Sequence, residues 1–366
     1  MNKVRIGFIG VGQIGKMHLD AYMNIPGAEV VAAADVNEVE LNRVADMYNI
    51  PHRYTDFRKL LERDDIDAVD VCLHNNLHMP FTVAALEAGK NVYCEKPIAG
   101  SYIDGVKMLE TAQKCKRKLS IQLATLFSGE TRVAKKLIEN DRLGNIYHAR
   151  STGFRRRGRP YVDGYGTEFF VKKETAGGGA LFDMGVYHIA QILYLIGMPE
   201  VTRISGKIHQ ETDMDTARRA KSGYNVEELG LGLVKFEGGL TMDIIESWAM
   251  HLNTFEASYI AGSQGGIQFD PLTYHTAMDG MEMDATFRVD GICARWSDLV
   301  EDDEAYTSPQ GHWVAALQGR VDLLPTADVA LQTMLVSEGI YLSDHLGREV
   351  TPEEVMEKSK SNAVKI

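Results

Sequence analysis

The most constraining feature of this sequence is a regular alternation of short apolar runs and amphipathic stretches between residues 4 and 122. The apolar runs are rich in Val, Ile and Ala, which is typical of strands that are covered on both faces. Strands that alternate with helices predict a parallel sheet with helices packed on it. The predicted strands are 4–9, 30–34, 68–73, 91–94 and 119–123, and the predicted helices are 13–24, 39–48, 79–88 and 102–116.

The pattern changes after residue 123, where strand-like segments follow one another with few helices between them. Successive strands favour an antiparallel sheet. We therefore expect a parallel α/β domain over residues 1–123 and an α+β domain over residues 124–366. The acidic stretch 298–304 is predicted to be a solvated loop, and the tail after Glu357 is predicted to be frayed. In the second domain the predicted strands are 146–154, 201–210, 229–236, 240–248 and 255–261, and the predicted helices are 131–140, 179–195, 310–319 and 329–346.

Composition and charge argue against several classes of protein. Of 366 residues, 39 are Lys or Arg and 51 are Asp or Glu, which gives a net charge of −12 and no basic domain, so a nucleic-acid partner is not expected. No apolar stretch of about 18 residues occurs, so we expect no membrane span, and the first residues lack the pattern of a signal peptide. The four scattered cysteines suit reduced thiols in the cytoplasm. The histidines have no spacing typical of zinc sites, so no metal is expected.

A glycine-rich turn follows the first predicted strand and begins the first helix, Gly10-Val11-Gly12-Gln13-Ile14-Gly15. In such a turn the first glycine allows a tight bend, the second lets a pyrophosphate approach the backbone, and the third lets helix and strand pack closely. The N-terminus of the helix adds a partial positive charge. We therefore assign cofactor contacts to Gly10, Gly12, Gln13, Ile14 and Gly15.

Asp35 ends the second predicted strand, 20 residues after Gly15. A carboxylate at this place accepts hydrogen bonds from the adenosine ribose hydroxyls of a dinucleotide. It would also repel a 2′-phosphate, and no arginine follows at positions 36–38. The sequence therefore favours NAD over NADP as the cofactor.

The tripeptide Glu95-Lys96-Pro97 directly follows the predicted strand 91–94. Ligands of open α/β sheets bind beyond the carboxyl ends of the strands, so Lys96 would lie where a nicotinamide and its substrate meet. Pro97 restricts Lys96 to an extended backbone. The lysine ammonium could stabilise the alkoxide that develops as a hydride leaves. Taken alone, the tripeptide is also typical of an exposed strand end.

Together with these motifs, several further segments resemble the Gfo/Idh/MocA family, the relatives of glucose-fructose oxidoreductase and inositol dehydrogenase. The resemblance implies a Rossmann domain that holds NAD(P), and a C-terminal domain with a large, mostly antiparallel sheet whose open face commonly makes dimers or tetramers. It also implies that the family's lysine corresponds to Lys96 and its aspartate to Asp183. The segments are Asn76-Leu77-His78, 88–92, Gly177-Gly178-Gly179-Ala180-Leu181-Phe182-Asp183-Met184-Gly185 and Gly339-Ile340-Tyr341-Leu342-Ser343.

One departure from the family pattern concerns the acid/base residue. Many members place a histidine four residues after the aspartate, whereas this chain has Tyr187 there and His188 next to it. On a helix Asp183 and Tyr187 share a face, while position 188 is turned about 100° further. We therefore predict Tyr187 as the acid/base, aided by the Lys96 charge, which would lower the phenol pKa. His188 is the alternative, with a buried structural histidine as the third reading.

A second departure is His74-Asn75, where relatives usually carry Thr-Pro before the asparagine. His74, Asn75 and Asn76 are still expected to line the cofactor cleft at a strand end, together with Glu95. His78 is expected to cap or begin the following helix, with a cofactor contact as the alternative.

A basic cluster stands out in this acidic chain, Arg155-Arg156-Arg157-Gly158-Arg159-Pro160, with Tyr161 and Tyr165 close by. Family members gather substrate contacts in this part of the chain. Arginines and an aromatic ring would suit a polyhydroxylated sugar, so Arg155, Arg157 and Tyr165 are predicted substrate contacts. A solvated or subunit-contacting loop is an equally good reading for any single arginine.

These expectations combine into an NAD-dependent dehydrogenase that oxidises a secondary hydroxyl of a sugar, glycoside or cyclitol. C3 of a glucoside is the preferred position, on the range of the family rather than on any residue. Two alternatives remain, a redox-cycling glycoside-cleaving enzyme that retains NAD and a non-catalytic NAD-binding regulator. The expected partners are a small-molecule carbohydrate and further copies of the same chain.

Overall fold

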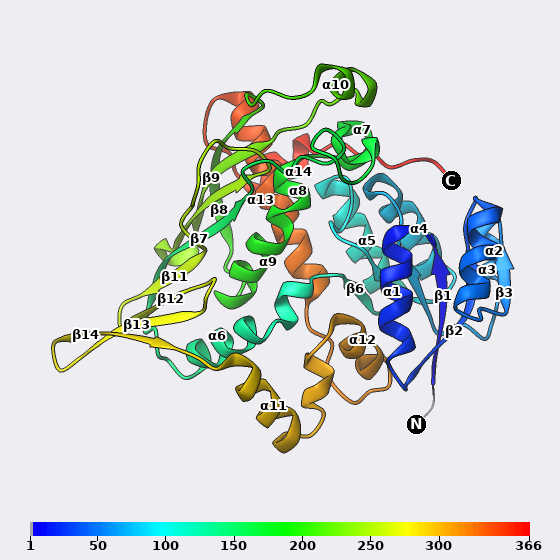
Figure 1. The fold of residues 1–366 in the computed structure, drawn as a ribbon, viewed down its shortest axis with the longest axis horizontal. Helices are drawn as coiled ribbons and strands as arrows, with labels where there is room; N and C mark the ends of the chain where they lie inside the picture. Colours follow the sequence, from blue (N-terminus) through cyan, green and yellow to red (C-terminus); the bar gives the residue numbers. More distant parts are fainter. Residues whose placement is uncertain (1–2) are drawn as a thin grey trace.

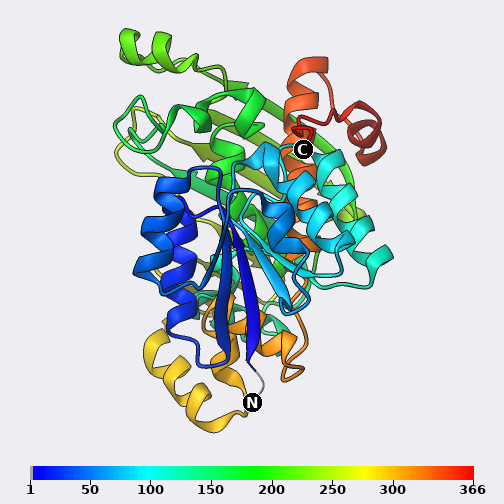
Figure 2. The ribbon, with the colours of Figure 1, turned by 90° about the vertical axis from the view of Figure 1, so that its right-hand side faces the viewer.

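The computed structural model describes residues 3–366. Its first part is a six-stranded parallel sheet in the order β3-β2-β1-β4-β5-β6, which confirms the predicted α/β architecture (Figures 1 and 2). The strands are β1 Val4–Ile9, β2 Ala28–Ala34, β3 His52–Tyr54, β4 Ala68–Val71, β5 Asn91–Cys94 and β6 Leu119–Ile121. The helices between them are α1 Gln13–Met23, α2 Glu38–Met47, α3 Phe57–Leu61, α4 Asn75–Glu87 and α5 Tyr102–Cys115.

The sequence pattern does not predict two short elements of this part, β3 and α3. β3 has three residues at the edge of the sheet, and its His52 and Arg53 are exposed. A polar edge strand lacks the apolar run that marks a buried strand. α3 has five residues and is capped by Asp56, which is too short for helical periodicity to be visible.

The strand order reverses beside β1, and this reversal positions the site. β1 pairs with β2 on one side and with β4 on the other. Ligands of open α/β sheets bind in the crevice beyond the carboxyl ends of the strands at such a point. The glycine turn follows β1 and Lys96 follows β5, so both lie at this edge of the sheet.

The second part is built on an eight-stranded sheet in the order β14-β13-β12-β11-β7-β10-β9-β8 (Figure 1). All neighbouring strands run antiparallel except β7 and β10, so the sheet is mostly antiparallel, as expected. The strands are β7 Ile146–Phe154, β8 Val201–His209, β9 Leu229–Phe236, β10 Thr241–Ser247, β11 Tyr259–Gly262, β12 Gly265–Gln268, β13 Thr273–Met278 and β14 Met281–Thr286.

The last three strands of this sheet, β12, β13 and β14, are absent from the sequence prediction. β12 contains two glycines, which weaken a strand signal. β13 and β14 form a hairpin that extends from the body of the molecule (Figure 1), and most of the side chains of β14 are exposed. Because apolar runs mark only strands that are buried, strands held mainly by pairing escape this kind of prediction.

The helices of the second part depart from prediction in several places, and α7, α10, α11 and α14 have no predicted counterpart. The predicted helix 179–195 is two helices, α8 and α9, which meet at Met184. The acidic stretch 298–304 includes the end of α11 and a short 3₁₀ turn, where Asp303 pairs with Arg132 at 2.6 Å, so this stretch is not simply a solvated loop. The helices are α6 Gly129–Glu139, α7 Lys173–Ala176, α8 Ala180–Asp183, α9 Gly185–Leu195, α10 Thr216–Ser222, α11 Val289–Leu299, α12 Pro309–Leu317, α13 Thr326–Leu346 and α14 Pro352–Lys358.

The tail after Glu357 is ordered against the first part of the chain. The Val364 N–H donates to the Asn76 carbonyl at 3.2 Å, and Ile366 borders the cavity that contains Asp35. The prediction of a frayed tail is wrong because these contacts reach residues almost 300 positions earlier, which the local sequence does not reveal.

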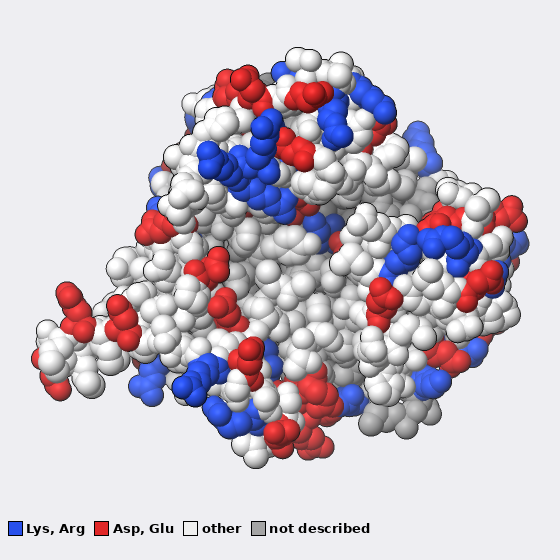
Figure 3. Space-filling view, in the orientation of Figure 1, with Lys and Arg blue, Asp and Glu red and all other residues white. Residues whose placement is uncertain are grey.

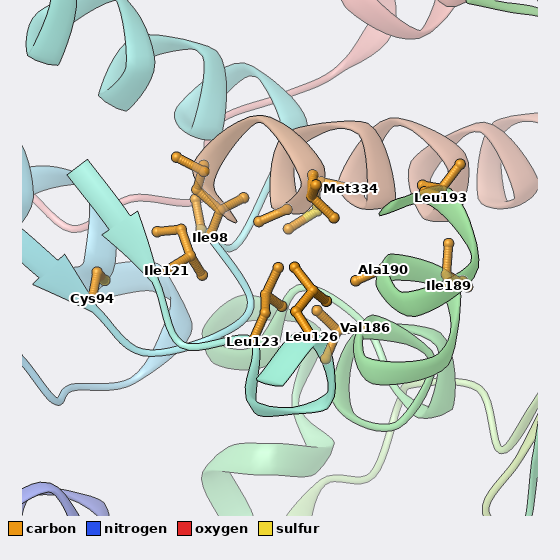
Figure 4. Packing of buried hydrophobic residues seen from close by; sticks show 14 of the residues in the cluster. Cys94, Ile98, Ile121, Leu123, Leu126, Val186, Ile189, Ala190, Leu193 and Met334 are labelled. Carbon is orange, nitrogen blue, oxygen red and sulfur yellow. The ribbon is translucent and has the colours of Figure 1, made fainter. Parts of the chain in front are cut away.

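One hydrophobic core joins the two parts of the chain. Figure 4 shows this core between β5, β6, α9 and α13, and its side chains are buried. A second cluster places Trp313 of α12 with Phe8 and Tyr93 of the first part. Because α12 and α13 complete the packing of the first part, the division at residues 123 and 124 stays a prediction. None of the helices within residues 3–366 is long and apolar enough to cross a membrane. The labelled core residues are Cys94, Ile98, Ile121, Leu123, Leu126, Val186, Ile189, Ala190, Leu193 and Met334.

Candidate active site

The glycine turn after β1 has the geometry of a pyrophosphate site. Gly10 has a φ of +94°, and a Cβ on it would lie 2.3 Å from the Cys72 carbonyl oxygen. A Cβ on Gly15 would lie 2.3 Å from the Gly10 carbonyl oxygen, whereas a Cβ on Gly12 would meet no atom within 4 Å. No described side chain caps the N-terminus of α1. The turn therefore leaves an open space and uncapped N–H groups at the start of the helix, which fit a phosphate group.

Asp35 lies at the end of β2, next to this turn. Its Oδ2 accepts a hydrogen bond from the Val11 N–H at 3.0 Å, and its Oδ1 accepts one from the Asn37 N–H at 2.9 Å. These bonds fix the carboxylate at the border of a cavity of about 340 Å³ that Gly10 and Leu77 also line. A fixed carboxylate beside the glycine turn fits the ribose hydroxyls of NAD.

Lys96, Asp183 and Tyr187 meet at the other end of the crevice. The Lys96 Nζ lies 3.2 Å from the Asp183 Oδ1 and 4.7 Å from the centre of the Tyr187 ring. All three residues line one cavity of about 410 Å³, which Ile14 at the start of α1 and Asn75 at the start of α4 also border. The fold thus brings an ammonium from the end of β5 to a carboxylate and a phenol from α8 and α9.

Sequence comparisons decide to which family this arrangement belongs. Residues 4–123 match the model of the GFO_IDH_MocA oxidoreductase family with an NAD-binding Rossmann fold. Residues 131–268 match the model of the GFO/IDH/MocA C-terminal domain. The chain belongs to the Gfo/Idh/MocA family. It is an oxidoreductase whose first part binds NAD, and the glycine turn and Asp35 are the residues that fit this cofactor.

Individual relatives agree with this assignment. D-glucoside 3-dehydrogenase of Escherichia coli is 26% identical over 95% of this chain and 97% of its own length. Myo-inositol 2-dehydrogenase of Thermotoga maritima is 29% identical over 60% of this chain and 66% of its own. The solved structure of levoglucosan dehydrogenase with NADH and L-sorbose has a TM-score of 0.77 at 21% identity, covering 96% of this chain and 99% of the other.

In this Gfo/Idh/MocA chain Asp183 holds the lysine in place. Besides its bond to Lys96, it accepts a hydrogen bond on Oδ2 from the Trp248 indole N–H at 3.1 Å, and Arg155 lies 4.0 Å away. Burial by itself lowers the pKa of Lys96, but Asp183 and the other groups around it raise that pKa above its usual range. Lys96 is therefore an ammonium at any physiological pH.

The Tyr187 phenol corrects one expectation from the sequence. The Lys96 charge does lower the phenol pKa, but burial raises it more, so the pKa lies above the usual value of about 10. Desolvation dominates because α9 packs this side chain into the wall of the cavity. Tyr187 is therefore a neutral phenol at neutral pH, a hydrogen-bond donor in its resting state.

His188 lies apart from Lys96. Its Nδ1 is 3.0 Å from the Glu246 Oε2 on β10, and it borders a different cavity of about 740 Å³. Tyr187 lines both this cavity and the one at Lys96. Of these two neighbouring positions on α9, Tyr187 thus borders both cavities, and His188 borders the second.

Of the predicted cofactor residues at the start of α4, Asn75 borders the cavity at Lys96, whereas His74 and Asn76 are not among the residues that border it. Asn75 lines the cavity at Lys96, and its amide donates to the Ala176 carbonyl at 2.8 Å. His74 directly precedes α4 without a side-chain capping bond, and its ring packs on Phe169 with 4.8 Å between ring centres. Asn76 is buried and donates to the Glu174 carbonyl at 3.3 Å. These contacts connect the start of α4 to the segment 169–176.

His78 is fully buried within α4 and lies away from the two cavities. Its ring nitrogens lie 2.8 Å from the Pro97 carbonyl and 3.0 Å from the Leu73 carbonyl. It therefore ties the end of β4 to the loop that carries Lys96. The expectation that His78 caps or begins the helix is wrong, because α4 already begins at Asn75, and the role of His78 within it is structural.

Sequence reasoning missed a buried network behind Lys96. The His18 Nδ1 lies 3.0 Å from Asp70, and its Nε2 lies 3.0 Å from Glu95. The other oxygen of Glu95 accepts a hydrogen bond from the Lys96 N–H at 2.8 Å. The signal was available, because Asp70 is a charged residue in the middle of the apolar strand β4. Glu95 thus borders the cavity, but its carboxylate is bound to His18.

His18, Asp70 and Cys72 are also close enough to hold a metal, with ligand atoms within 4.8 Å of one another. The Cys72 Sγ donates to Asp70 at 3.1 Å, and burial raises the pKa of this thiol. A protonated thiol in a satisfied hydrogen-bond network is a poor metal ligand. The expectation of no metal stays a prediction.

The arginine cluster divides in three. Arg155 donates to the Tyr165 hydroxyl at 2.6 Å and borders the 740 Å³ cavity, whereas Tyr165 itself is not among its lining residues. Arg157 is 68% exposed and lies 3.3 Å from Asp163. Arg159 is fully buried on Asp163 and Glu228. Basic side chains gather at the rim of the hollow between the two parts (Figure 3), and Arg155 borders the 740 Å³ cavity.

Proposed function

We propose that this enzyme oxidises a secondary hydroxyl of a sugar, glycoside or cyclitol and passes the hydride to NAD, with C3 of a glucoside as the preferred position. The observation that carries the proposal is the single cavity in which Lys96, Asp183 and Tyr187 converge between the two parts of the chain. The glucoside and cyclitol relatives support the substrate class.

In this proposal Lys96 binds the substrate hydroxyl and stabilises the alkoxide that develops at its oxygen. An ammonium in a partly buried site stabilises negative charge more strongly than it would in water. Asp183 fixes the position of the ammonium, at 3.2 Å. The Trp248 indole and Arg155 keep the other oxygen of Asp183 in place, so the lysine does not have to reorganise during the reaction.

Tyr187 exchanges the hydroxyl proton. When bound, NAD would supply the hydride acceptor for this oxidation. Because burial raises the phenol pKa, the base form grows with pH, and oxidation of the alcohol should accelerate on the alkaline side of neutrality. Reduction of the corresponding ketone needs the protonated phenol and should be favoured at lower pH.

The test is NADH formation by the purified protein across a panel of methyl glucosides, free hexoses and cyclitols, with a 3-deoxy glucoside as the matched negative substrate. We expect oxidation of at least one glucoside and none of its 3-deoxy form. Released aglycone without net NADH would instead indicate redox-cycling cleavage. No hydride transfer to any member of the panel would contradict the proposal.

Two variants test the assigned roles. Tyr187→Phe should reduce kcat by about 10²- to 10⁴-fold and flatten its rise with pH, because the proton acceptor is gone. Lys96→Met should remove a comparable or larger part of the rate and leave NAD affinity near that of the wild type, as measured by quenching of tryptophan fluorescence. Full activity in Lys96→Met would refute the mechanism. The expected homo-oligomer and the cytoplasmic location stay predictions.

A further inference from the structure

A second cavity lies beside Tyr187, and apart from Tyr187 it is bordered by other residues than the cavity at Lys96. It has a volume of about 740 Å³ and lies entirely on the second part of the chain. Residues from the end of β7, from α9 and from the segment 255–258 border it. Tyr187 separates it from the reacting cavity, and Arg155 reaches from it to within 4.0 Å of Asp183. A substrate held at Lys96 could therefore extend past Tyr187 into this space.

His188 is oriented toward this cavity by a buried carboxylate. Glu246 is fully buried, and its Oε2 lies 3.0 Å from the His188 Nδ1. Ser151 donates a second hydrogen bond to the same carboxylate, at 3.2 Å. No described residue bonds the His188 Nε2, and the side chain is 31% exposed. A carboxylate on Nδ1 sets the orientation of the ring and leaves Nε2 for a ligand.

The backbone makes room for this pair at Gly153. A Cβ at this position would lie 2.1 Å from the Glu246 Oε2 and 2.5 Å from the His188 ring. Glycine is thus required on β7 for the histidine and the carboxylate to meet. The contact between His188 and Glu246 therefore depends on a glycine at this position of β7.

The lining chemistry fits a neutral polyhydroxylated ring. Phe154 and Phe255 stack with 5.9 Å between ring centres at 24°, and aromatic faces of this kind bind the apolar face of a sugar. The polar side chains of Ser128 and Gln191 also border this cavity. Glu130, Glu256 and Asp270 border the same cavity as Arg155 and His188. Their negative charges disfavour an anionic ligand.

We propose that this cavity is a second sugar subsite, in which His188, oriented by Glu246, binds the sugar that follows the oxidised ring of a disaccharide or larger glycoside. The proposal rests on the proposed function and narrows its substrate class to glycosides whose second residue is itself a sugar. Glu246 is the positioning residue of the pair, and His188 makes the contact.

The experiment compares a glucosyl-glucose disaccharide with methyl glucoside as substrates. We expect the wild type to favour the disaccharide in kcat/KM by about tenfold, chiefly through KM, which is about 1.4 kcal/mol of added binding. His188→Leu should abolish this ratio. Glu246→Gln should lower it as well, because the ring loses the charge that orients it. The matched control is His275→Gln, which removes another histidine paired with a carboxylate, Asp284 at 2.6 Å, on the distant β13–β14 hairpin; its ratio should equal that of the wild type.

Binding separates failure of this inference from failure of the proposed function. Calorimetric titration of both sugars into Lys96→Met, with and without His188→Leu, reports the subsite even if no sugar is oxidised. A disaccharide preference that survives His188→Leu in both turnover and binding would overturn the subsite and leave the dehydrogenase proposal standing. Absence of turnover with the binding preference intact would overturn the dehydrogenase proposal alone. Circular dichroism of each variant checks that it is folded.

Discussion

Two histidines, one in each wall of the crevice, show how the same chemistry is used in different ways. His18 on α1 has a carboxylate on each ring nitrogen, Asp70 and Glu95, and all three side chains are buried. His188 on α9 has one carboxylate, Glu246, and its second nitrogen borders an open cavity. The first imidazole is saturated and holds structure together, whereas the second retains an atom for a ligand.

The difference teaches that the number of partners around the ring, and not the burial of those partners, decides whether an imidazole nitrogen stays available. Both histidines pair with a fully or nearly fully buried carboxylate. In the first wall the network continues through Glu95 to the backbone of Lys96, so it stiffens the lysine loop. In the second part of the chain, the hydrogen bonds from Ser151 through Glu246 end at His188, which borders the 740 Å³ cavity.

The largest expected effect is on stability, with His→Gln at each position as the matched pair. A single amide cannot serve both carboxylates around His18, so His18→Gln should lower the free energy of unfolding by about 3–5 kcal/mol, the typical cost of breaking a buried ion pair. His188→Gln can keep a donor on Glu246 and should cost about 1 kcal/mol. Urea denaturation measures both. Equal losses would break the comparison.

The pH dependence of stability gives the next effect. Burial by itself lowers the pKa of His18, but the Asp70 carboxylate that pairs with its ring raises that pKa well above the usual range. A raised pKa in the folded state gives stability that is complete below about pH 6.5 and is lost as pH rises through the folded value, at about 1.4 kcal/mol per pH unit. Denaturation of wild type and His18→Gln between about pH 6 and 9 should show their difference shrinking. A constant difference would mean that His18 is neutral in the folded protein.

A smaller effect separates closed from open positions within the glycine turn. Gly15→Ala places a Cβ against the Gly10 carbonyl, at 2.3 Å, and should destabilise the fold by about 1–3 kcal/mol. Gly12→Ala meets no protein atom within 4 Å, so stability should stay near that of the wild type while NAD affinity falls by about tenfold or more, since the methyl enters the pyrophosphate space. Thermal melts and NAD titration distinguish the two, and a stable Gly12→Ala with unchanged NAD affinity would contradict the assignment.

The smallest expected effect concerns the arginine cluster of the second wall. Arg157→Ala removes an exposed side chain whose partner is Asp163, so unfolding should change by less than about 0.5 kcal/mol and sugar KM should not change. Arg155→Ala removes a side chain that borders the cavity and should raise sugar KM by about threefold to tenfold. A larger KM effect for Arg157 would restore it as a substrate contact.

The sequence predicted the fold well wherever burial produces a local pattern. The five predicted strands of the first sheet exist because each is covered by helices and must be apolar. β3, β13 and β14 were missed because edge and hairpin strands carry no such requirement. The tail was misread because its contacts to Asn76 and to the Asp35 cavity are distant in sequence.

The site was predicted in part for the same reason. The glycine turn, Asp35 and Lys96 lie at the strand ends where the sequence places them, whereas Tyr187 borders the cavity at Lys96 and also the one that His188 borders. The sign of the Tyr187 pKa shift could not be foreseen, because it depends on how much water the packing of α9 removes compared with the Lys96 charge. Nor could the sequence distinguish Arg155, which borders a cavity, from the buried Arg159 four residues later.

What the sequence by itself determined is the set of local rules: where strands and helices form, which glycines a tight turn requires, and which strand ends carry reactive groups. Only the tertiary structure decided which nitrogen atoms of His18 and His188 have a carboxylate partner. His18 meets Asp70 and Glu95, and His188 meets Glu246, across separations of 52 to 77 residues. The physical reason is that backbone conformation depends on neighbouring residues, whereas the protonation and availability of a side chain depend on whatever the folded chain packs against it.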